Sequence, residues 1–190
     1  MSEDSSFRNK PRRVVKPLDS QRLEELALAY VAKFSTSTVK FERYLKRKLR
    51  ERGWEGEGDP PVEATVERYV ELGYVDDEGY ARMKSASLLR RGYGGRRVRQ
   101  ALGEAGIAED LREAVAPGER ASRTAALTYA RKRRFGPFGM ELPERDAAEK
   151  QIAAMLRAGH GFAAARALVE AADEAEAEEW VAEASDEMEP

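Results

Sequence analysis

The sequence predicts an all-α protein made of three three-helix bundles in tandem, which together form an elongated, curved molecule. Apolar residues recur at steps of three and four along most of the chain, which is the period of an amphipathic helix. These helix-like segments repeat at a spacing of 53 or 54 residues. Charged residues make up 36% of the chain and aromatic residues 8%, which favours small units with a large surface over one compact globule.

The repeat is clearest in the middle helix of each bundle. Leu45, Val98 and Ile152 fall 53 and 54 residues apart at equivalent apolar positions. Gly53 and Gly106 end the first two of these helices, and two glycines flank the matching position in the third copy. A long period with a shared apolar position and a glycine stop is typical of repeat proteins, whose small units stabilise one another by contact.

The helix signals divide the chain into three bundles and two tails. We predict a disordered basic arm at 1–19, helical repeats at 20–75, 76–118 and 119–172, and an acidic tail at 173–190. The arm shows scattered charge and little apolar periodicity, which is typical of a segment that buries no core.

In the first repeat, the apolar stripe that begins at Ser20 predicts an amphipathic helix. The STST run at 35–38 offers N-cap oxygens for a second helix, which we expect to end at Gly53. A loop rich in glycine and proline then leads to a third helix from about Val62 to Leu72.

In the second repeat, Asp76 and Asp77 are expected to cap a helix that breaks at a glycine corner. Another helix begins at Arg96, and a short third helix lies near Leu111 before Pro117 ends the unit.

The third repeat begins near Glu119 with a helix that breaks at the FGPFG motif. An apolar stripe around Ile152 predicts its second helix. The last helix begins at Phe162 and runs toward the acidic tail.

The net charge of −2 conceals an uneven distribution. Residues 173–190 hold nine acids and no base, whereas residues 21–172 hold 28 bases and 23 acids, a net charge of +5. A basic body suggests a polyanion or an acidic protein as partner, and the tail could compete for the same surface. An acidic terminus that only aids solubility fits the composition equally well.

Composition also excludes several classes of protein. The chain contains no cysteine, which excludes disulfides and thiolate chemistry and fits a reducing compartment. No apolar run approaches the roughly 18 residues of a membrane span, and the N-terminus lacks the apolar core of a secretory signal. We therefore expect a cytoplasmic protein without membrane contact.

The most informative stretch is LLRRGYGGRRVRQALGEAGI at 88–107, where two basic helices meet at a glycine corner. We call it the arginine elbow. Glycine permits a tight corner, so the two helices should pack together and share one exposed basic side. Guanidinium groups bind carboxylates and phosphates in bidentate pairs, which predicts a contact surface for a partner. The predicted contact residues of the elbow are Arg90, Arg91, Tyr93, Arg96, Arg97 and Arg99.

Two further basic clusters are weaker candidates for the same surface. The first repeat contributes Lys46, Arg47 and Arg50, and the third contributes Arg131, Lys132, Arg133 and Arg134. Charge runs on helices are more often solvated faces than binding sites. For Tyr93, packing inside the elbow is favoured over stacking on a base or a partner.

No constellation of residues indicates catalysis. Asp76 and Asp77 are better explained as helix caps than as a metal or catalytic pair. His160, the single histidine, is flanked by glycines at a helix end, and acid–base chemistry would require an orienting partner. The GYGG motif lacks the lysine and the hydroxyl residue of a phosphate-binding loop. We predict no enzyme activity, no cofactor and no metal site.

Several of these segments resemble the bacterial regulatory protein family RecX across about residues 20–172. They are YLKRKLRERGW (44–54), LGYVDDEGYA (72–81), RRGYGGRRVRQAL (90–102), RRFG (133–136) and EKQIAAMLRAGHGF (149–162). The resemblance implies an elongated molecule of tandem three-helix repeats, in agreement with the repeat analysis. It also implies a protein that binds the RecA recombinase filament on single-stranded DNA and restrains its growth, ATPase and strand exchange.

The resemblance therefore predicts a non-catalytic inhibitor of RecA, expected as a monomer. Its partner is the RecA filament, and it could also contact single- or double-stranded DNA directly. The alternative is a free-standing helical DNA-binding protein that acts through its basic helix faces alone. Binding to bare DNA that falls steeply with salt would favour this alternative, whereas preference for RecA-coated DNA would favour the first hypothesis.

Overall fold

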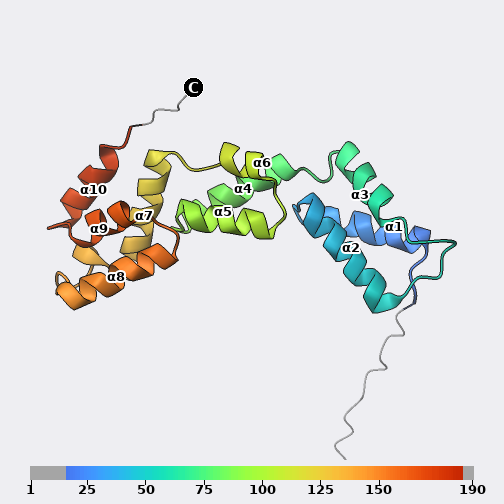
Figure 1. The fold of residues 1–190 in the computed structure, drawn as a ribbon, viewed down its shortest axis with the longest axis horizontal. Coiled ribbons are helices and arrows are strands. Elements are labelled where there is room, and N and C mark those ends of the chain that lie inside the picture. The colour runs from blue at the N-terminus through green and yellow to red at the C-terminus, as the bar shows by residue number, and fades with distance from the viewer. Residues whose placement is uncertain (1–15, 186–190) are drawn as a thin grey trace, which may run out of the picture.

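The computed structural model describes residues 16–185 and confirms the predicted all-helical fold (Figure 1). Three separate apolar cores follow one another along an elongated, gently curved molecule. We call the parts of the chain around these cores unit 1, unit 2 and unit 3. Within the described residues, none of the helices is both long and apolar enough to cross a membrane.

Unit 1 consists of α1 (Ser20–Val31), α2 (Thr38–Arg52) and α3 (Val62–Glu71). The side chains of Asp19 and Ser37 cap α1 and α2 by accepting hydrogen bonds from N–H groups of the first turn. Gly53 ends α2 at a φ of +80°, a conformation that glycine adopts without strain. The three helices enclose a core around the fully buried Phe41 and Leu45.

The segment before α1 differs from the prediction of a disordered arm. Residues 1–15 of that arm lie outside the described residues, but Leu18 is fully buried in the core of unit 1. Its N–H donates to the Gly53 carbonyl at 3.0 Å, and its carbonyl accepts from the Glu55 N–H at 2.8 Å. The end of the arm is therefore an N-terminal strap across the C-terminal end of α2. One isolated leucine carries no periodicity, so the apolar pattern could not reveal it.

Unit 2 consists of α4 (Asp77–Arg90), α5 (Gly95–Glu104) and α6 (Glu109–Ala114). The Asp76 carboxylate accepts hydrogen bonds from the N–H groups of Glu78 and Gly79, both at 3.0 Å, which confirms it as a cap. Asp77 was predicted to cap the same helix, but its carboxylate accepts from the Thr38 N–H at 2.7 Å. It therefore caps the neighbouring α2, a role that depends on how units 1 and 2 meet.

Unit 3 contains α7 (Glu119–Arg133), the 3-10 helix η1 (Gly136–Phe138), α8 (Arg145–Arg157), α9 (Phe162–Val169) and α10 (Glu174–Ala182). The sequence predicted only an acidic tail from residue 173, but α10 packs against α7. Ala177 is fully buried there, and the Arg123 guanidinium lies 4.5 Å from the centre of the Trp180 ring. The many acids of α10 conceal an inner face on which Ala177 is buried and Trp180 and Val181 are partly buried, so charge alone was misleading.

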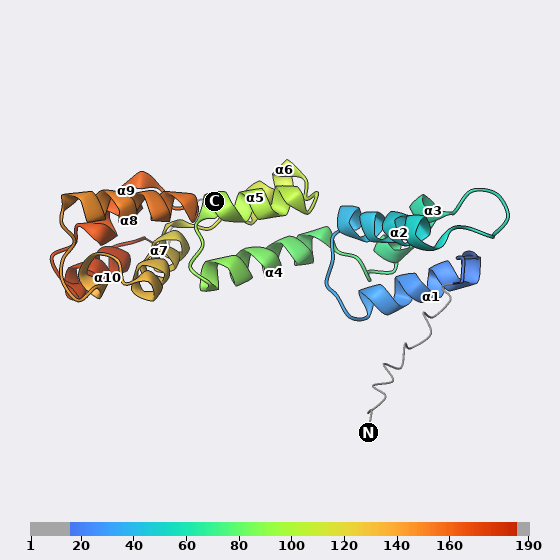
Figure 2. The same ribbon diagram turned by 90° about the horizontal axis from the view of Figure 1, so that it is seen from below.

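The middle helices of the three units form a column in which helix ends meet (Figure 2). Its order is α8, α5, α2, which is opposite to the order along the chain. The C-terminal carbonyls of α8 accept hydrogen bonds from the start of α5, and those of α5 accept from α2. Each contact satisfies carbonyls that a helix end otherwise leaves unpaired, and it places opposite ends of two helix dipoles together.

Backbone groups make the joint between units 2 and 3. The N–H of Gly94 donates to the Ala158 carbonyl at 3.0 Å, and the N–H of Arg96 donates to the Gly159 carbonyl at 3.2 Å. In addition, α4 packs against α7 beside the column.

Side chains make most of the joint between units 1 and 2. The Ser37 hydroxyl donates to the Ala105 carbonyl at 2.5 Å, and the Arg43 guanidinium donates to the Glu104 carbonyl at 3.0 Å. A Cβ atom at Gly106 would lie 2.4 Å from the Cβ of Val39, so glycine is required where the two helix ends touch.

The close approach at Gly94 generates a testable prediction. A Cβ atom there would lie 2.3 Å from the Gly159 carbonyl oxygen and 2.5 Å from the His160 nitrogen, which are backbone atoms that cannot turn aside. We expect Gly94→Ala to destabilise the protein by about 1–3 kcal/mol through overpacking. Thermal unfolding followed by circular dichroism measures the effect.

Gly161→Ala is the matched control. Gly161 is also a helix N-cap with a negative φ, but nothing lies within 4 Å of an added Cβ atom. An equal loss of stability in the two variants would show that the close backbone contact at Gly94 is not the cause of the loss.

Candidate functional site

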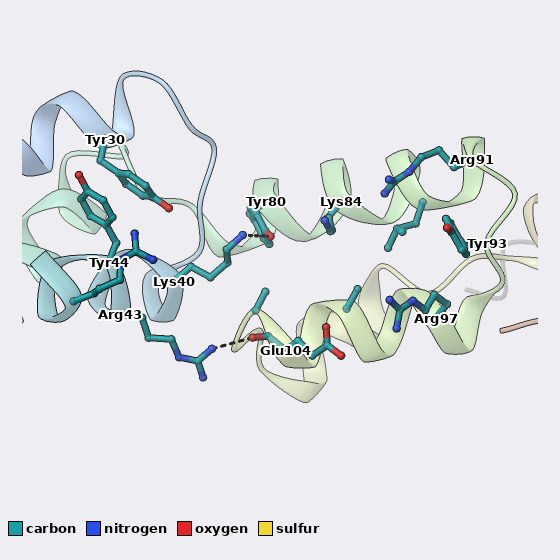
Figure 3. A pocket seen from close by; sticks show the side chains of 14 residues that line it. Tyr30, Lys40, Arg43, Tyr44, Tyr80, Lys84, Arg91, Tyr93, Arg97 and Glu104 are labelled. Atoms are coloured by element: carbon teal, nitrogen blue, oxygen red, sulfur yellow. Dashed lines mark hydrogen bonds between the residues drawn. The ribbon is translucent and has the colours of Figure 1, made fainter. Parts of the chain in front are cut away.

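An open groove lies between units 1 and 2, beside the joint that connects them (Figure 3). Its volume is about 580 Å³. Polar and charged side chains predominate among the residues that line it, with tyrosines at intervals. They are Tyr30, Lys40, Arg43, Tyr44, Arg47, Tyr80, Lys84, Leu88, Arg91, Tyr93, Arg97, Ala101, Glu104 and Ala105.

Helical periodicity explains how these side chains reach one surface. Lys40, Arg43, Tyr44 and Arg47 are three or four residues apart on α2, so they project from one face of that helix. On α4, residues at the same spacing line a second wall of the groove. They are Tyr80, Lys84, Leu88 and the C-cap residue Arg91. The start and end of α5 complete the groove, as Figure 3 shows.

The charge of the groove is strongly unbalanced. Six of its lining residues are cations, and Glu104 is the single acid among them. Lys40 donates to the Tyr80 hydroxyl at 3.0 Å, and Arg97 donates to the Gln100 side chain at 2.9 Å, so neither charge is neutralised by these contacts. Arg47 does have a carboxylate partner, Glu51, with 3.6 Å between their atoms. The excess of positive charge makes the groove suitable for an anionic ligand.

The tyrosines form two aromatic platforms, one on each side of the cations. Tyr30 and Tyr44 stack on unit 1 with 3.9 Å between ring centres, and the Arg47 guanidinium lies 5.5 Å from the Tyr44 ring. On unit 2, the Arg91 guanidinium lies 5.7 Å from the Tyr93 ring. Burial raises the pKa of Tyr44, against the opposing effect of nearby Lys48, so this phenol stays neutral at physiological pH.

The groove therefore has the charge and the side chains to suit an extended anion. Its guanidinium groups can bind phosphates or carboxylates in bidentate pairs. Its ring faces can stack against bases or other planar groups. Among the described residues, no group of histidines and acids could hold a metal ion.

The structure divides the residues of the arginine elbow. Arg91, Tyr93 and Arg97 line the groove, with Tyr93 at its wall. The Arg96 guanidinium donates to the His160 carbonyl at 2.7 Å, so this side chain joins unit 2 to unit 3. Arg90 and Arg99 are exposed elsewhere on the surface, because the corner directs successive residues to different faces.

The cluster predicted in the first repeat is also divided. Arg47 lines the groove, whereas Lys46 and Arg50 line a different hollow between α2 and the start of α3.

The cluster predicted in the third repeat does not line the groove and is largely occupied by internal contacts. Arg131 pairs with Glu178 of α10, and Lys132 donates to the Arg91 carbonyl at 3.3 Å. The Arg133 guanidinium lies 5.8 Å from the Tyr129 ring, and Arg134 ends α7 with a φ of +56°. These contacts explain much of the basic run as structure within unit 3 and at its joint with unit 2.

The sequence analysis missed half of the cations in the groove. Lys40, Arg43 and Lys84 were not singled out, and neither were Tyr30, Tyr44 and Tyr80. The available signal was the regular spacing of basic and tyrosine residues on α2 and α4. It could not be used without knowing that units 1 and 2 meet end to end and turn these faces toward each other.

His160 has a structural position at the joint between units 2 and 3. Its side chain is buried, and Nε2 donates to the Gly92 carbonyl at 2.9 Å, which connects α8 to the elbow. Burial lowers the pKa of His160, the Arg96 guanidinium lowers it further, and the bond to Gly92 has the opposite effect.

The fold and the groove define a helical repeat protein with a cationic groove on its surface. A family model described as "RecX, second three-helix domain" matches residues 76–115, which contain all three helices of unit 2. A regulatory protein RecX of Myxococcus xanthus is 32% identical over 157 residues, which is 78% of this chain and 84% of the relative. Another from Agrobacterium fabrum is 34% identical over 122 residues, covering 62% of this chain and 65% of that relative.

Solved structures support the same assignment at the level of the fold. The crystal structure of RecX from Lactobacillus salivarius aligns with a TM-score of 0.62 and 16% identity, covering 78% of this chain and 93% of that one. A second crystal structure of a regulatory protein RecX gives a TM-score of 0.59 at 19% identity, covering 76% and 68%. The chain belongs to the RecX family of regulatory proteins, as the sequence motifs predicted.

The buried histidine generates a prediction about pH. The folded-state pKa of His160 lies below the ordinary value of 6.5, so the unfolded chain binds the proton more readily. The stability that neutral His160 contributes is therefore complete above pH 6.5 and is lost as the pH falls from there through the folded-state pKa. Melting temperatures measured from about pH 8 to about pH 5 should reveal this loss.

His160→Gln supplies the comparison, because its amide can still donate to the Gly92 carbonyl but does not titrate. We expect the difference in melting temperature between wild type and variant to change across that range. A difference in melting temperature that stays constant with pH would show that protonation of His160 does not affect the stability of the protein.

Proposed function

We propose that this protein is a non-catalytic modulator of the RecA recombinase. On this proposal it binds the RecA filament on single-stranded DNA and restrains filament growth, ATP hydrolysis and strand exchange. Membership of a family of regulatory proteins supports the proposal, as does the open cationic groove across units 1 and 2. The groove is the single observation that turns the family resemblance into a testable contact surface.

The length and shape of the molecule fit a partner that is itself extended. Three units in a column present their helix faces along one line, so contacts can be distributed over a long surface (Figure 1). An elongated surface with one strongly cationic groove suits a nucleoprotein filament, which offers acidic protein surfaces and DNA phosphates at regular intervals. On this view the protein acts by occupying the filament and not by chemistry.

The tyrosines of the groove favour a second candidate function, a free-standing DNA-binding protein. Aromatic rings among cations are a common feature of proteins that hold single strands. The two candidates differ in their response to salt, because affinity that depends on phosphates alone falls steeply as salt rises. Retention of binding to RecA-coated DNA at a salt concentration that abolishes binding to bare DNA favours the RecA modulator.

Removing charge from the groove tests the proposal. Arg47, Arg91 and Arg97 are groove residues on three different segments, and Arg47 is well exposed, so their replacement by alanine should leave the helices intact. We expect at least about tenfold weaker inhibition of the DNA-dependent ATPase of RecA, since a hydrogen bond to a charged group contributes about 1.5–3 kcal/mol. A titration of RecA ATPase with each variant gives the inhibitory concentration.

The matched control removes Arg50, Arg90 and Arg99, which lie on or beside the same helices but outside the groove. It should inhibit RecA nearly as well as wild type, and circular dichroism should show the same helical content in both variants. Equal inhibition by the groove variant and wild type would exclude the groove as the contact surface. No inhibition by wild type at a large excess would refute the proposed function itself.

A further inference from the structure

The two joints of the column differ in how firmly they hold their units. Units 2 and 3 share backbone hydrogen bonds at Gly94 and Arg96, the buried His160, and the packing of α4 against α7. Glycine is required at Gly92 as well, because a Cβ atom there would lie 2.9 Å from the backbone nitrogen of Tyr129. These contacts join units 2 and 3 along two helices and not only at helix ends.

Units 1 and 2 are joined by contacts of a different kind. Within residues 16–185, no hydrogen bond between backbone groups connects unit 1 to unit 2. Their direct hydrogen bonds involve side chains, such as Ser37 to the Ala105 carbonyl and Lys40 to the Tyr80 hydroxyl. The contact of Val39 with Gly106 adds apolar area, but the cores of the two units remain separate. Side-chain contacts between the start of α2 and the ends of α4 and α5 can rearrange more easily than a shared core.

The groove lies beside this weaker joint, with cations on both sides. Lys40, Arg43 and Arg47 belong to unit 1, whereas Lys84, Arg91 and Arg97 belong to unit 2. Figure 3 shows Lys40 and Arg43 of unit 1 at one end of the groove, and Lys84, Arg91 and Arg97 along it on α4 and α5. These like charges repel one another, and the repulsion opposes the approach of unit 1 to unit 2. A bound chain of negative charges would convert this repulsion into attraction of both units to the chain.

We propose that the joint between units 1 and 2 is a hinge, and that the phosphates of a single nucleic-acid strand in the groove hold it closed. Units 2 and 3 then move as one rigid body, while unit 1 changes its angle when no strand is bound. The negative phosphates of the strand neutralise the cations of both units and so allow unit 1 to approach unit 2. The inference rests on the proposed function in one respect: it takes the RecA filament as the place where the protein meets such a strand.

The lining favours a single strand over an acidic protein segment. The Tyr30–Tyr44 pair and Tyr93 lie on either side of the cations, so bases that project from a strand can stack while its phosphates contact the cations between them. An acidic peptide would satisfy the cations but carries no bases that could take the places of Arg47 and Arg91 over the Tyr44 and Tyr93 rings. A duplex holds its bases paired inside and cannot use the rings in this way.

Pulsed electron resonance between spin labels tests the hinge in the full-length protein. The chain contains no cysteine, so introduced cysteines carry all of the label. Glu67→Cys on α3 and Lys150→Cys on α8 report the distance across the hinge, and both positions are exposed. Asp110→Cys on α6 with Lys150→Cys is the control pair within units 2 and 3.

We expect a broad distance distribution for the first pair in the free protein and a narrow one for the control pair. An oligothymidylate, added until fluorescence anisotropy shows saturation, should narrow the first distribution and leave the control unchanged. Equal widths for the two pairs in the free protein would overturn the hinge. Saturation by the strand without narrowing would overturn its role in closing the hinge. Polyglutamate that narrows the distribution as well as oligothymidylate at equal charge would overturn the assignment to a nucleic-acid strand.

Lys84→Glu tests the charge argument without any ligand. It places a carboxylate near the cations of unit 1, so attraction replaces repulsion between the two units. The distance distribution between the labels at positions 67 and 150 should therefore narrow in the free protein. Arg82→Glu, on the same helix but outside the groove, is the matched control and should leave the width unchanged. Identical distributions in both variants would show that repulsion across the groove does not set the hinge. Because RecA is absent from these measurements, their failure is distinct from a failure of the proposed function, which the RecA ATPase titration tests.

Discussion

The contact of one helix end with the next is the interaction on which the rest of this structure depends. A short helix leaves several N–H groups and carbonyls unpaired at its ends, and a small bundle has little core to compensate for them. In this protein, the carbonyls at the C-terminal end of α8 accept hydrogen bonds from the start of α5, and those at the end of α5 accept from the start of α2. The contact requires two backbones to approach closely, which explains the glycines at Gly94, Gly106 and Gly159. The same geometry turns α2 toward α4 and so creates the groove.

Family membership and the groove bear on function in different ways. The relationship to RecX regulatory proteins rests on sequence identity along most of the chain, whereas the similarity to the two solved structures concerns the fold. The groove adds a specific surface, because its cations and tyrosines come from helices of two units and meet only in the folded chain. On the function proposed above, regulation of the filament would need no catalytic residue. It needs a shape and a charge that fit an extended partner.

The fold could be predicted because its signals are local and repeated. Apolar spacing, the cap at Asp76 and the glycine stop at Gly53 each act within a few residues, so the sequence shows them directly. Contacts between distant segments could not be predicted in this way. Arg96 looked like a partner contact until the structure placed it against the end of α8, and Lys84 gained its importance only from the unit opposite. Charge also concealed burial in α10, where Ala177 belongs to the core of unit 3.

The N-terminal strap has a consequence for the order in which the protein is made. Leu18 closes the C-terminal end of α2, so every contact that completes unit 1 on that side is synthesised before units 2 and 3. At the opposite end of α2, Ser37 caps the helix from within unit 1, and its hydroxyl gains the Ala105 carbonyl as acceptor only when unit 2 has been made. Unit 1 thus contains its own core and helix caps before the contacts to unit 2 form. Each later unit can then dock onto a partner that is already folded, so the column grows from its strapped end.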